Sequence, residues 1–80
     1  MIKTIKFPKL SANMESGVIV SWNKQPGDFV KKGDVLFEVE TDKVVSEVES
    51  LEDGRLSKII FGEGDQAKVD EAVAEIETAE

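Results

Sequence analysis

The second half of this 80-residue chain repeats the first at a spacing of 37 positions, so that residues 17–41 align with residues 54–78. Apolar positions also correspond across the two halves, as Val39 and Ile76 do. Two equivalent halves predict two equivalent layers that are related by an approximate two-fold axis. The aligned pairs that are identical are Gly17 and Gly54, Gly27 and Gly64, Asp28 and Asp65, Lys31 and Lys68, Glu38 and Glu75, Glu40 and Glu77, and Thr41 and Thr78.

Short runs of β-branched and alternating residues, separated by turn signals such as Gln25-Pro26-Gly27-Asp28, predict strands. Helical spacing is weak everywhere, and residues 67–74 offer only two valines in support of a helix. Lys3, Lys6 and Lys9 alternate with apolar residues and are expected on the solvent face of an edge strand. The predicted fold class is therefore all-β, a small sandwich or barrel. The expected strands are residues 2–8, 18–22, 35–40, 44–49, 56–61 and 73–77, and residues 29–30 are a short apolar segment between two turns.

The composition excludes several classes of function. The chain has no cysteine and no histidine, which removes disulfides, thiol nucleophiles, Cys/His metal sites and the usual general base. Its carboxylates do not have the spacing of a dedicated metal site, so we expect no metal. The net charge is −7 and no basic stripe is present, which argues against a nucleic-acid partner. No apolar run is long enough to cross a membrane, so we expect no membrane partner and a protein that binds or carries something inside the cell.

A single lysine stands in the short polar segment Thr41-Asp42-Lys43-Val44, between the two expected strands 35–40 and 44–49. Aspartate favours a turn here, so Lys43 is predicted at the tip of a hairpin. A lysine at a turn is most often a solvated charge. In the register of the repeat, however, the tip corresponds to the last two residues of the chain. Lys43 and the C-terminus are therefore expected at opposite ends of the molecule.

Several motifs together resemble the lipoyl domain of the acyltransferase (E2) component of 2-oxo acid dehydrogenase complexes. The resemblance implies a flattened barrel of two four-stranded antiparallel sheets with quasi-two-fold symmetry. It also implies that residues 1–80 form one lipoyl domain, the N-terminal part of a longer E2 chain, with (R)-lipoate amide-linked to Lys43. The motifs are Pro8-Lys9-Leu10-Ser11, Met14-Glu15-Ser16-Gly17, Pro26-Gly27-Asp28, Gly33-Asp34-Val35-Leu36, Glu38-Val39-Glu40-Thr41-Asp42-Lys43-Val44 and Glu63-Gly64-Asp65.

The resemblance assigns recognition roles to residues around the lysine. Asp42 and Val44 would flank the lipoyl-lysine within the Glu-Thr-Asp-Lys tetrad, and Glu40 matches the acidic position three residues before it. Gly27 and Gly54 match glycines that shape a recognition surface. A surface loop would help the decarboxylase (E1) to recognise its own carrier. That loop comprises Lys9, Leu10, Ser11, Ala12, Asn13, Met14, Glu15 and Ser16, and Thr41 completes the predicted recognition set.

The same resemblance implies a swinging arm that carries acyl groups and electrons among E1, the E2 catalytic core and dihydrolipoamide dehydrogenase (E3). A lipoate ligase or lipoyl transferase would attach the group, and the isolated domain is expected to be a monomer without catalytic activity. The loop motif favours a pyruvate or acetoin dehydrogenase. The expected location is the bacterial cytoplasm, or the mitochondrial matrix in a eukaryote, although no transit peptide is present. Leu51, Gly62 and Asp70 depart from the family pattern in turns away from Lys43.

Three alternatives remain open at this point. A biotin carrier domain shares the fold, but its lysine characteristically lies between methionines, where this chain has Asp42 and Val44. A glycine-cleavage carrier protein is also lipoylated, but it is normally larger. A non-covalent acidic β interaction module would leave Lys43 unmodified.

Overall fold

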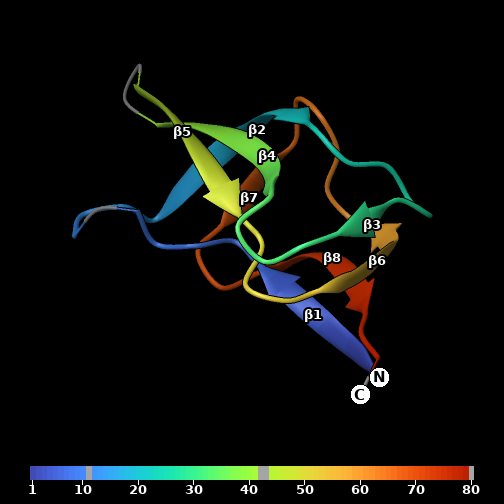
Figure 1. Cartoon of the computed structure of the whole chain (residues 1–80). Helices are drawn as coiled ribbons and strands as arrows, with labels where there is room; N and C mark the ends of the chain where they lie inside the picture. The colour runs from blue at the N-terminus through green and yellow to red at the C-terminus, as the bar shows by residue number, and fades with distance from the viewer. Residues whose placement is uncertain (11, 42–43, 80) are drawn as a thin grey trace.

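The computed structural model describes residues 1–10, 12–41 and 44–79, which form eight strands and no helix (Figure 1). This part of the chain therefore contains no helix that could span a membrane. Strand pairing gives two antiparallel sheets, sheet A in the order β1-β8-β6-β3 and sheet B in the order β5-β4-β2-β7. The strands are β1 (Ile2–Lys6), β2 (Ser16–Trp22), β3 (Phe29–Val30), β4 (Val35–Thr41), β5 (Val44–Glu49), β6 (Gly54–Ile59), β7 (Gln66–Lys68) and β8 (Ala72–Glu77).

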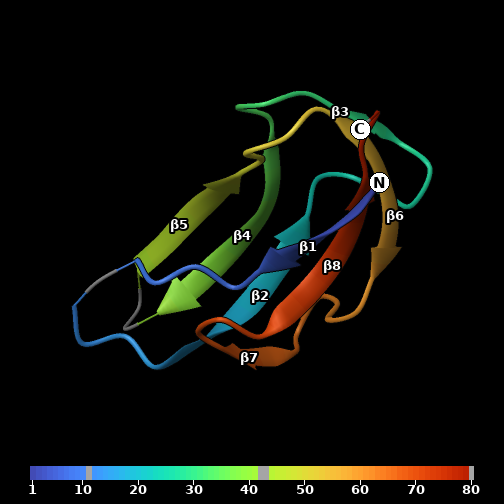
Figure 2. The same cartoon turned by 90° about the horizontal axis from the view of Figure 1, so that it is seen from below.

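The two sheets repeat one another strand for strand. A shift of 37 residues carries β2, β3 and β4 onto β6, β7 and β8, and β1 then takes the place in sheet A that β5 has in sheet B. The short strands are exchanged between the halves, because β3 pairs with β6 and β7 pairs with β2 (Figure 2). The prediction of two four-stranded antiparallel sheets is confirmed. The sheets form a sandwich and do not close into the flattened barrel that we expected.

The repeat extends to the irregularities of the strands. In sheet B, Ile19 is opposite Val39 and Ser21 is opposite Glu38, so one extra residue is accommodated in β2. In sheet A, the pairs Leu56–Ile76 and Lys58–Glu75 show the same shift. Bulges of this kind bend a strand and increase its twist. Their recurrence at the same aligned position confirms the approximate two-fold relation.

The core lies between the sheets and is built from the inward-facing residues of the strands, together with Phe7 and Met14 from the segment between β1 and β2. Phe37 is central to it, because its ring centroid lies 6.4 Å from that of Phe7 and 4.6 Å from that of Trp22. The indole Nε1 of Trp22 donates a hydrogen bond to the Phe61 carbonyl oxygen at 2.9 Å, so the ring is buried without an unpaired donor. Burying one large apolar side chain contributes about 1.5–3 kcal/mol. The side chains buried almost completely are Phe7, Phe37, Ile19, Leu36, Leu56, Ile76, Val39 and Val73.

Several strand predictions are wrong in detail, such as the strand predicted over residues 56–61, which the structure places at Gly54–Ile59. The first strand ends at Lys6, because its pairing with β8 shifts after Ile5. Strand β7 was not predicted, since only Ala67 of its three residues is apolar. The repeat aligns β7 with β3, which was likewise expected only as a short apolar segment over residues 29–30.

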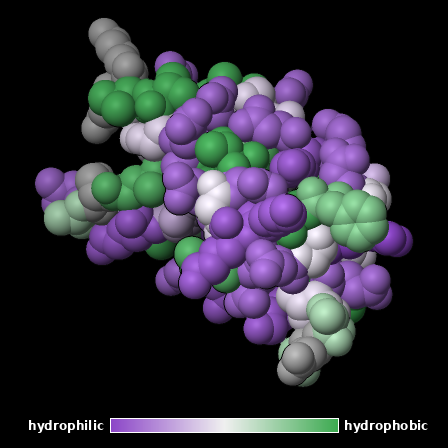
Figure 3. All heavy atoms as spheres, viewed as in Figure 1, coloured by the Kyte–Doolittle hydropathy of each residue, from purple (hydrophilic) through white to green (hydrophobic). Residues whose placement is uncertain are grey.

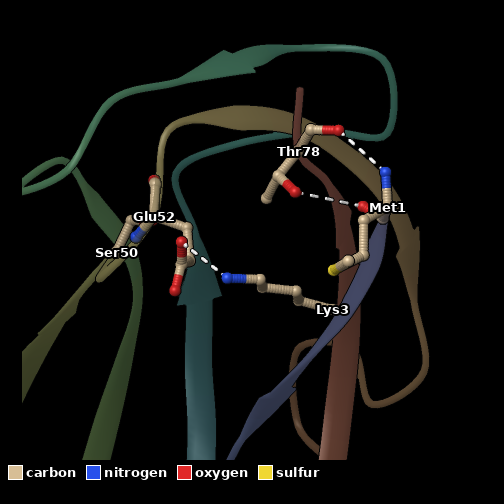
Figure 4. Close-up of polar contacts among 5 residues, drawn as sticks. All are labelled: Met1, Lys3, Ser50, Glu52 and Thr78. Atoms are coloured by element: carbon tan, nitrogen blue, oxygen red, sulfur yellow. Dashed lines mark hydrogen bonds and ion pairs between the residues drawn. The ribbon is translucent and has the colours of Figure 1, made fainter. Parts of the chain in front are cut away.

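Strand β1 also places its lysines differently from the prediction. Lys3 is opposite the buried Ile76, so it lies on the same side of the strand as the core. Its Nζ reaches the edge of the sandwich and pairs with the Glu52 carboxylate at 3.2 Å (Figure 4). The buried Ser50 hydroxyl donates to the Glu52 carbonyl oxygen at 2.6 Å and so holds this turn. The solvent-face prediction is therefore wrong for Lys3, whereas Lys6 is exposed.

Four tight turns share one design. In each, the amide of the fourth residue bonds to the carbonyl of the first, and the carboxylate of the fourth residue accepts the amide of the first. In the turn that ends at Asp34, this backbone bond from Lys31 holds the pKa of the Asp34 carboxyl below its usual range. The Lys24 ammonium at 3.5 Å acts in the same direction. The turns are residues 25–28, 31–34, 62–65 and 68–71.

The third residue of each turn has a positive φ, as the turn type requires. Gly33 adopts this conformation with a φ of 96°, but its counterpart in the repeat is Asp70, with a φ of 73°. A side chain at this backbone conformation is strained, although aspartate tolerates it better than most residues.

We expect Asp70→Gly to stabilise the domain by about 0.5 kcal/mol, because it removes this strain at the cost of a more flexible unfolded chain. A gain of this size raises the midpoint of thermal unfolding by about 2–4 °C in a domain of this length. The matched control is Gly33→Asp, which should destabilise by about 1 kcal/mol. An unfolding midpoint that falls in Asp70→Gly would contradict the assignment of strain to this turn.

Candidate functional site

Strands β4 and β5 form a hairpin that projects from sheet B. Thr41 and Val44 are its last paired residues, opposite one another in the register. Asp42 and Lys43, which the sequence places at its tip, lie outside the described residues. The hairpin end is far from the chain termini in both views of the fold (Figures 1 and 2).

Met1 and Thr78, near the two termini of the chain, are hydrogen-bonded to each other on the side of the molecule opposite the hairpin. The Met1 amino group donates to the Thr78 carbonyl oxygen at 2.9 Å (Figure 4). The Thr78 amide donates to the Met1 carbonyl oxygen at 2.8 Å. The molecule is 36 Å long and 20 Å across. The predicted separation of hairpin tip and terminus therefore holds for the strand ends Thr41 and Val44 and for Thr78.

The residues beside the predicted lysine differ in their environment. Glu40 is exposed on the outer face of sheet B, with Val18 and Val45 as its cross-strand neighbours. Thr41 lies over Gly17, where a Cβ atom would come within 2.8 Å of the Thr41 Cγ2 methyl. Apolar atoms follow the projecting hairpin (Figure 3), and Val44 and Val45 there are 59% and 53% exposed. The hairpin end thus combines an accessible carboxylate with accessible apolar side chains.

The predicted recognition loop is anchored by one buried side chain. Met14 is buried in the core, and its Sδ accepts a hydrogen bond from the Leu10 amide at 3.2 Å. Ser11 lies outside the described residues. The other members of the loop that precede Ser16 are exposed: Lys9, Leu10, Ala12, Asn13 and Glu15.

Residues from the second half of the chain hold the other end of this loop. The Val69 amide donates to the Glu15 carbonyl oxygen at 2.9 Å, and the Gln66 side chain donates to the Ser16 hydroxyl at 3.0 Å. No sequence motif indicates these anchors, although the repeat aligns Gln66 with Phe29 of β3. A polar hollow joins the loop to the hairpin, and it is lined by Asn13, Met14, Glu15, Ser16, Gly17, Glu40, Thr41 and Gln66.

Gly27 and Gly54 do not line the hollow between the recognition loop and the hairpin. Gly54 borders a hollow that also contains Met1 and Thr78, at the end where the termini meet. A Cβ at Gly54 would collide with the backbone carbonyl of Glu77, so the close approach of β6 and β8 requires glycine. The Gly27 amide donates to the Leu56 carbonyl oxygen at 2.7 Å. The fold accounts for both glycines, and their recognition role stays a prediction.

The chemistry of the site is that of a presentation surface. The described residues around the hairpin offer carboxylates, amides, hydroxyls and apolar groups, with no thiol or imidazole in the sequence. Among the residues that the structure describes, no cluster of carboxylates could hold a metal ion. This end of the fold can therefore serve as an accessible surface that other proteins contact.

Comparison with known proteins places this surface on a domain of known family. Residues 3–76 match the family model Biotin_lipoyl, described as biotin-requiring enzyme. The pyruvate dehydrogenase complex protein X component of Saccharomyces cerevisiae mitochondria is 49% identical over 63 residues, which are 79% of this chain and 15% of that protein. The dihydrolipoyllysine-residue succinyltransferase component of the 2-oxoglutarate dehydrogenase complex of Cupriavidus necator is 40% identical, over 96% of this chain and 18% of that protein. The chain thus spans less than a fifth of the length of these relatives.

A solved structure covers the whole domain. The lipoyl domain of the 2-oxoglutarate dehydrogenase complex from Azotobacter vinelandii superposes with a TM-score of 0.77 at 32% sequence identity. The match covers 96% of this chain and 98% of that domain, so the two are alike from end to end. The match to the family model and this likeness agree with the repeat, the paired sheets and the projecting hairpin. The chain therefore belongs to the Biotin_lipoyl family and, within it, to the lipoyl domains.

Proposed function

We propose that this domain is the lipoyl carrier of the E2 acyltransferase of a 2-oxo acid dehydrogenase complex, with (R)-lipoate amide-linked to Lys43. The observation that supports it best is the hairpin of β4 and β5, which ends at Thr41 and Val44, at the opposite end from Thr78. A tether near the termini would then leave the loaded end free to reach other active sites.

The residues present fit such a group. Its attachment needs one accessible primary amine, and Lys43 stands between two strand ends whose neighbours are exposed. The bound lipoyl group would supply the acyl-transfer and redox chemistry, since its dithiolane accepts acyl groups and electrons. The chain itself supplies position, through the paired hairpin strands, and recognition, through Glu40 and the loop that Met14 anchors. The absence of cysteine means that no protein thiol competes in exchange with the dithiolane.

The partners follow from this role. We infer that the carrier visits E1, the E2 catalytic core and E3, and that a lipoate ligase or lipoyl transferase loads it as a monomer inside the cell. The loop motif Leu10-Ser11-x-x-Met14 supports a pyruvate or acetoin dehydrogenase. Relatives of both the pyruvate and the 2-oxoglutarate type occur among the matched proteins, so the proposal of the pyruvate or acetoin type rests on that loop.

We expect Lys43→Arg to fold normally and to take up no lipoate, because arginine keeps the charge and lacks a primary amine that can form the amide. The measurement is the intact mass of the domain before and after incubation with lipoate, ATP and a lipoate ligase. Lys68→Arg is the matched control and should gain one lipoyl group, as the unmodified sequence does. Lipoate uptake by Lys43→Arg, or uptake of biotin in place of lipoate from a biotin ligase by the original chain, would contradict the proposal.

We expect Asp42→Ala to accept lipoate but to slow its reductive acylation by the decarboxylase about threefold or more, because a charge at the rim of a contact chiefly changes association rates. The measurement is the kcat/KM of acylation with the lipoylated domain as substrate. Glu77→Ala removes the same charge from sheet A and should leave this value unchanged. Equal rates in both variants would remove the recognition role from Asp42.

We expect Met14→Leu to fold but to loosen the recognition loop. Leucine keeps the apolar volume, usually at a cost below about 1.5 kcal/mol, whereas the Leu10 amide loses its sulfur acceptor. Hydrogen exchange at Leu10 should be faster, and kcat/KM of reductive acylation should fall about two- to fivefold, with lipoylation unchanged. Met1→Leu, at the exposed far end, is the control. Unchanged exchange at Leu10 would show that the sulfur does not hold the loop.

A further inference from the structure

The outer faces of the two sheets differ in charge although their strands correspond. The strands of sheet A carry two carboxylates and four cations, of which Lys3 lies on the core side, whereas those of sheet B carry four carboxylates and one lysine. Because the strands are related by the repeat, each charged position can be compared with its counterpart.

In sheet A, each outward glutamate of β8 has a cation opposite it on β6. Glu77 is opposite Arg55, and Glu75 is opposite Lys58. Opposite charges at directly paired positions stabilise a sheet modestly. Arg55 is further held in place because its guanidinium carbon lies 4.7 Å from the centroid of the Phe29 ring. Each outward carboxylate of sheet A therefore has a cation at its paired position without a partner protein.

In sheet B, the corresponding glutamates of β4 are kept but the cations are missing. Glu40 is opposite Val18 and Glu38 is opposite Ser21 on β2. On its other side Glu38 is opposite Glu47 of β5, an arrangement of like charges that destabilises a sheet. Among the described residues, neither these three carboxylates nor Glu75 and Glu77 of sheet A form an ion pair, so the sheets differ in which residue is opposite each carboxylate. Glu38 accepts one hydrogen bond, from the Ser21 hydroxyl at 2.9 Å.

Exposed apolar side chains lie among these carboxylates. Val18, Val20 and Val45 are 37%, 43% and 53% exposed. Val18 and Val45 are the two cross-strand neighbours of Glu40, so apolar and acidic groups alternate along one row of the face. Such a surface is complementary to a protein surface that has lysines or arginines around a small apolar centre.

We propose that this outer face of sheet B, built from Val18, Glu38, Glu40, Val45 and Glu47, docks the 2-oxo acid decarboxylase. Cations of the enzyme would take the positions opposite Glu38 and Glu40 that Lys58 and Arg55 have opposite Glu75 and Glu77 in sheet A. The face continues into the hairpin that carries Lys43, so an enzyme that engages the tip also meets it. A carrier must associate and dissociate in every cycle, and charge complementarity raises association rates more than affinity. This inference rests on the proposed function.

The test grafts the arrangement of sheet A onto sheet B. Val18→Arg places a cation opposite Glu40, as Arg55 is opposite Glu77, and should occupy the carboxylate that the enzyme needs. We expect kcat/KM for reductive acylation of the lipoylated domain to fall about five- to tenfold at low ionic strength. The difference from the original chain should shrink as salt is added, because salt screens exposed charges.

Two control variants separate this effect from net charge and from unfolding. Thr4→Lys adds the same charge to the outer face of sheet A, and Arg55→Val gives that face the valine of sheet B. Both should stay within about twofold of the original kcat/KM. The midpoint of thermal unfolding of Val18→Arg should not fall, since the new arginine meets a glutamate.

The outcomes separate a failure of the docking face from a failure of the carrier function. Intact mass is measured first, and a domain that takes up no lipoate overturns the proposed function itself. If Val18→Arg is lipoylated and is acylated as fast as Thr4→Lys, the docking face is wrong while the carrier function stands. A loss that does not depend on salt likewise overturns the charge pairing.

Discussion

The antiparallel pairing of β2 with β4 determines where every other part of the site lies. Phe37 and Val39 of β4 are buried in the core, so Glu38 and Glu40 must face outward. A slip of one residue would exchange these two sets, because side chains alternate along a strand. Burial of the aromatic core therefore fixes the direction in which the hairpin leaves the sandwich. The close approach of Thr41 over Gly17 then holds the last pair of that hairpin against β2.

Much of this arrangement could be predicted because the chain encodes it twice. The 37-residue repeat predicted two sheets, and the tertiary structure repeats even the bulges at Ile19/Ser21 and Leu56/Lys58. The polar strand β7 escaped prediction, because its residues are held by backbone pairing with β2 and not by an apolar pattern. Alternation was also a poor guide in β1, where Lys3 lies on the core side and pairs with a residue 49 positions away.

The site shows a similar limit. The tetrad around Lys43 and the loop before Ser16 were found from motifs, and the fold brings Glu40 and Thr41 together with that loop. The anchors of the loop were not found, because a methionine in a polar segment gives no sign that its side chain is buried. The contacts from Val69 and Gln66 are tertiary and depend on the exchange of short strands between the halves. Motifs thus identified the hairpin and the recognition loop, whereas tertiary packing determines how firmly the loop is held.

The 37-residue repeat gives the two ends of this molecule corresponding pairs of strands, β4 with β5 at one end and β8 with β1 at the other. Met1 and Thr78 are hydrogen-bonded to one another beside β1 and β8, in the place that corresponds to the paired strand ends Thr41 and Val44 at the other end. A short covalent link between these neighbours would therefore close the chain into a ring of two equivalent units. Circular permutants opened at an exposed turn, such as residues 31–34, should then keep the same sandwich. Such a domain can also be inserted into a loop of a host protein, since its entry and exit points lie side by side.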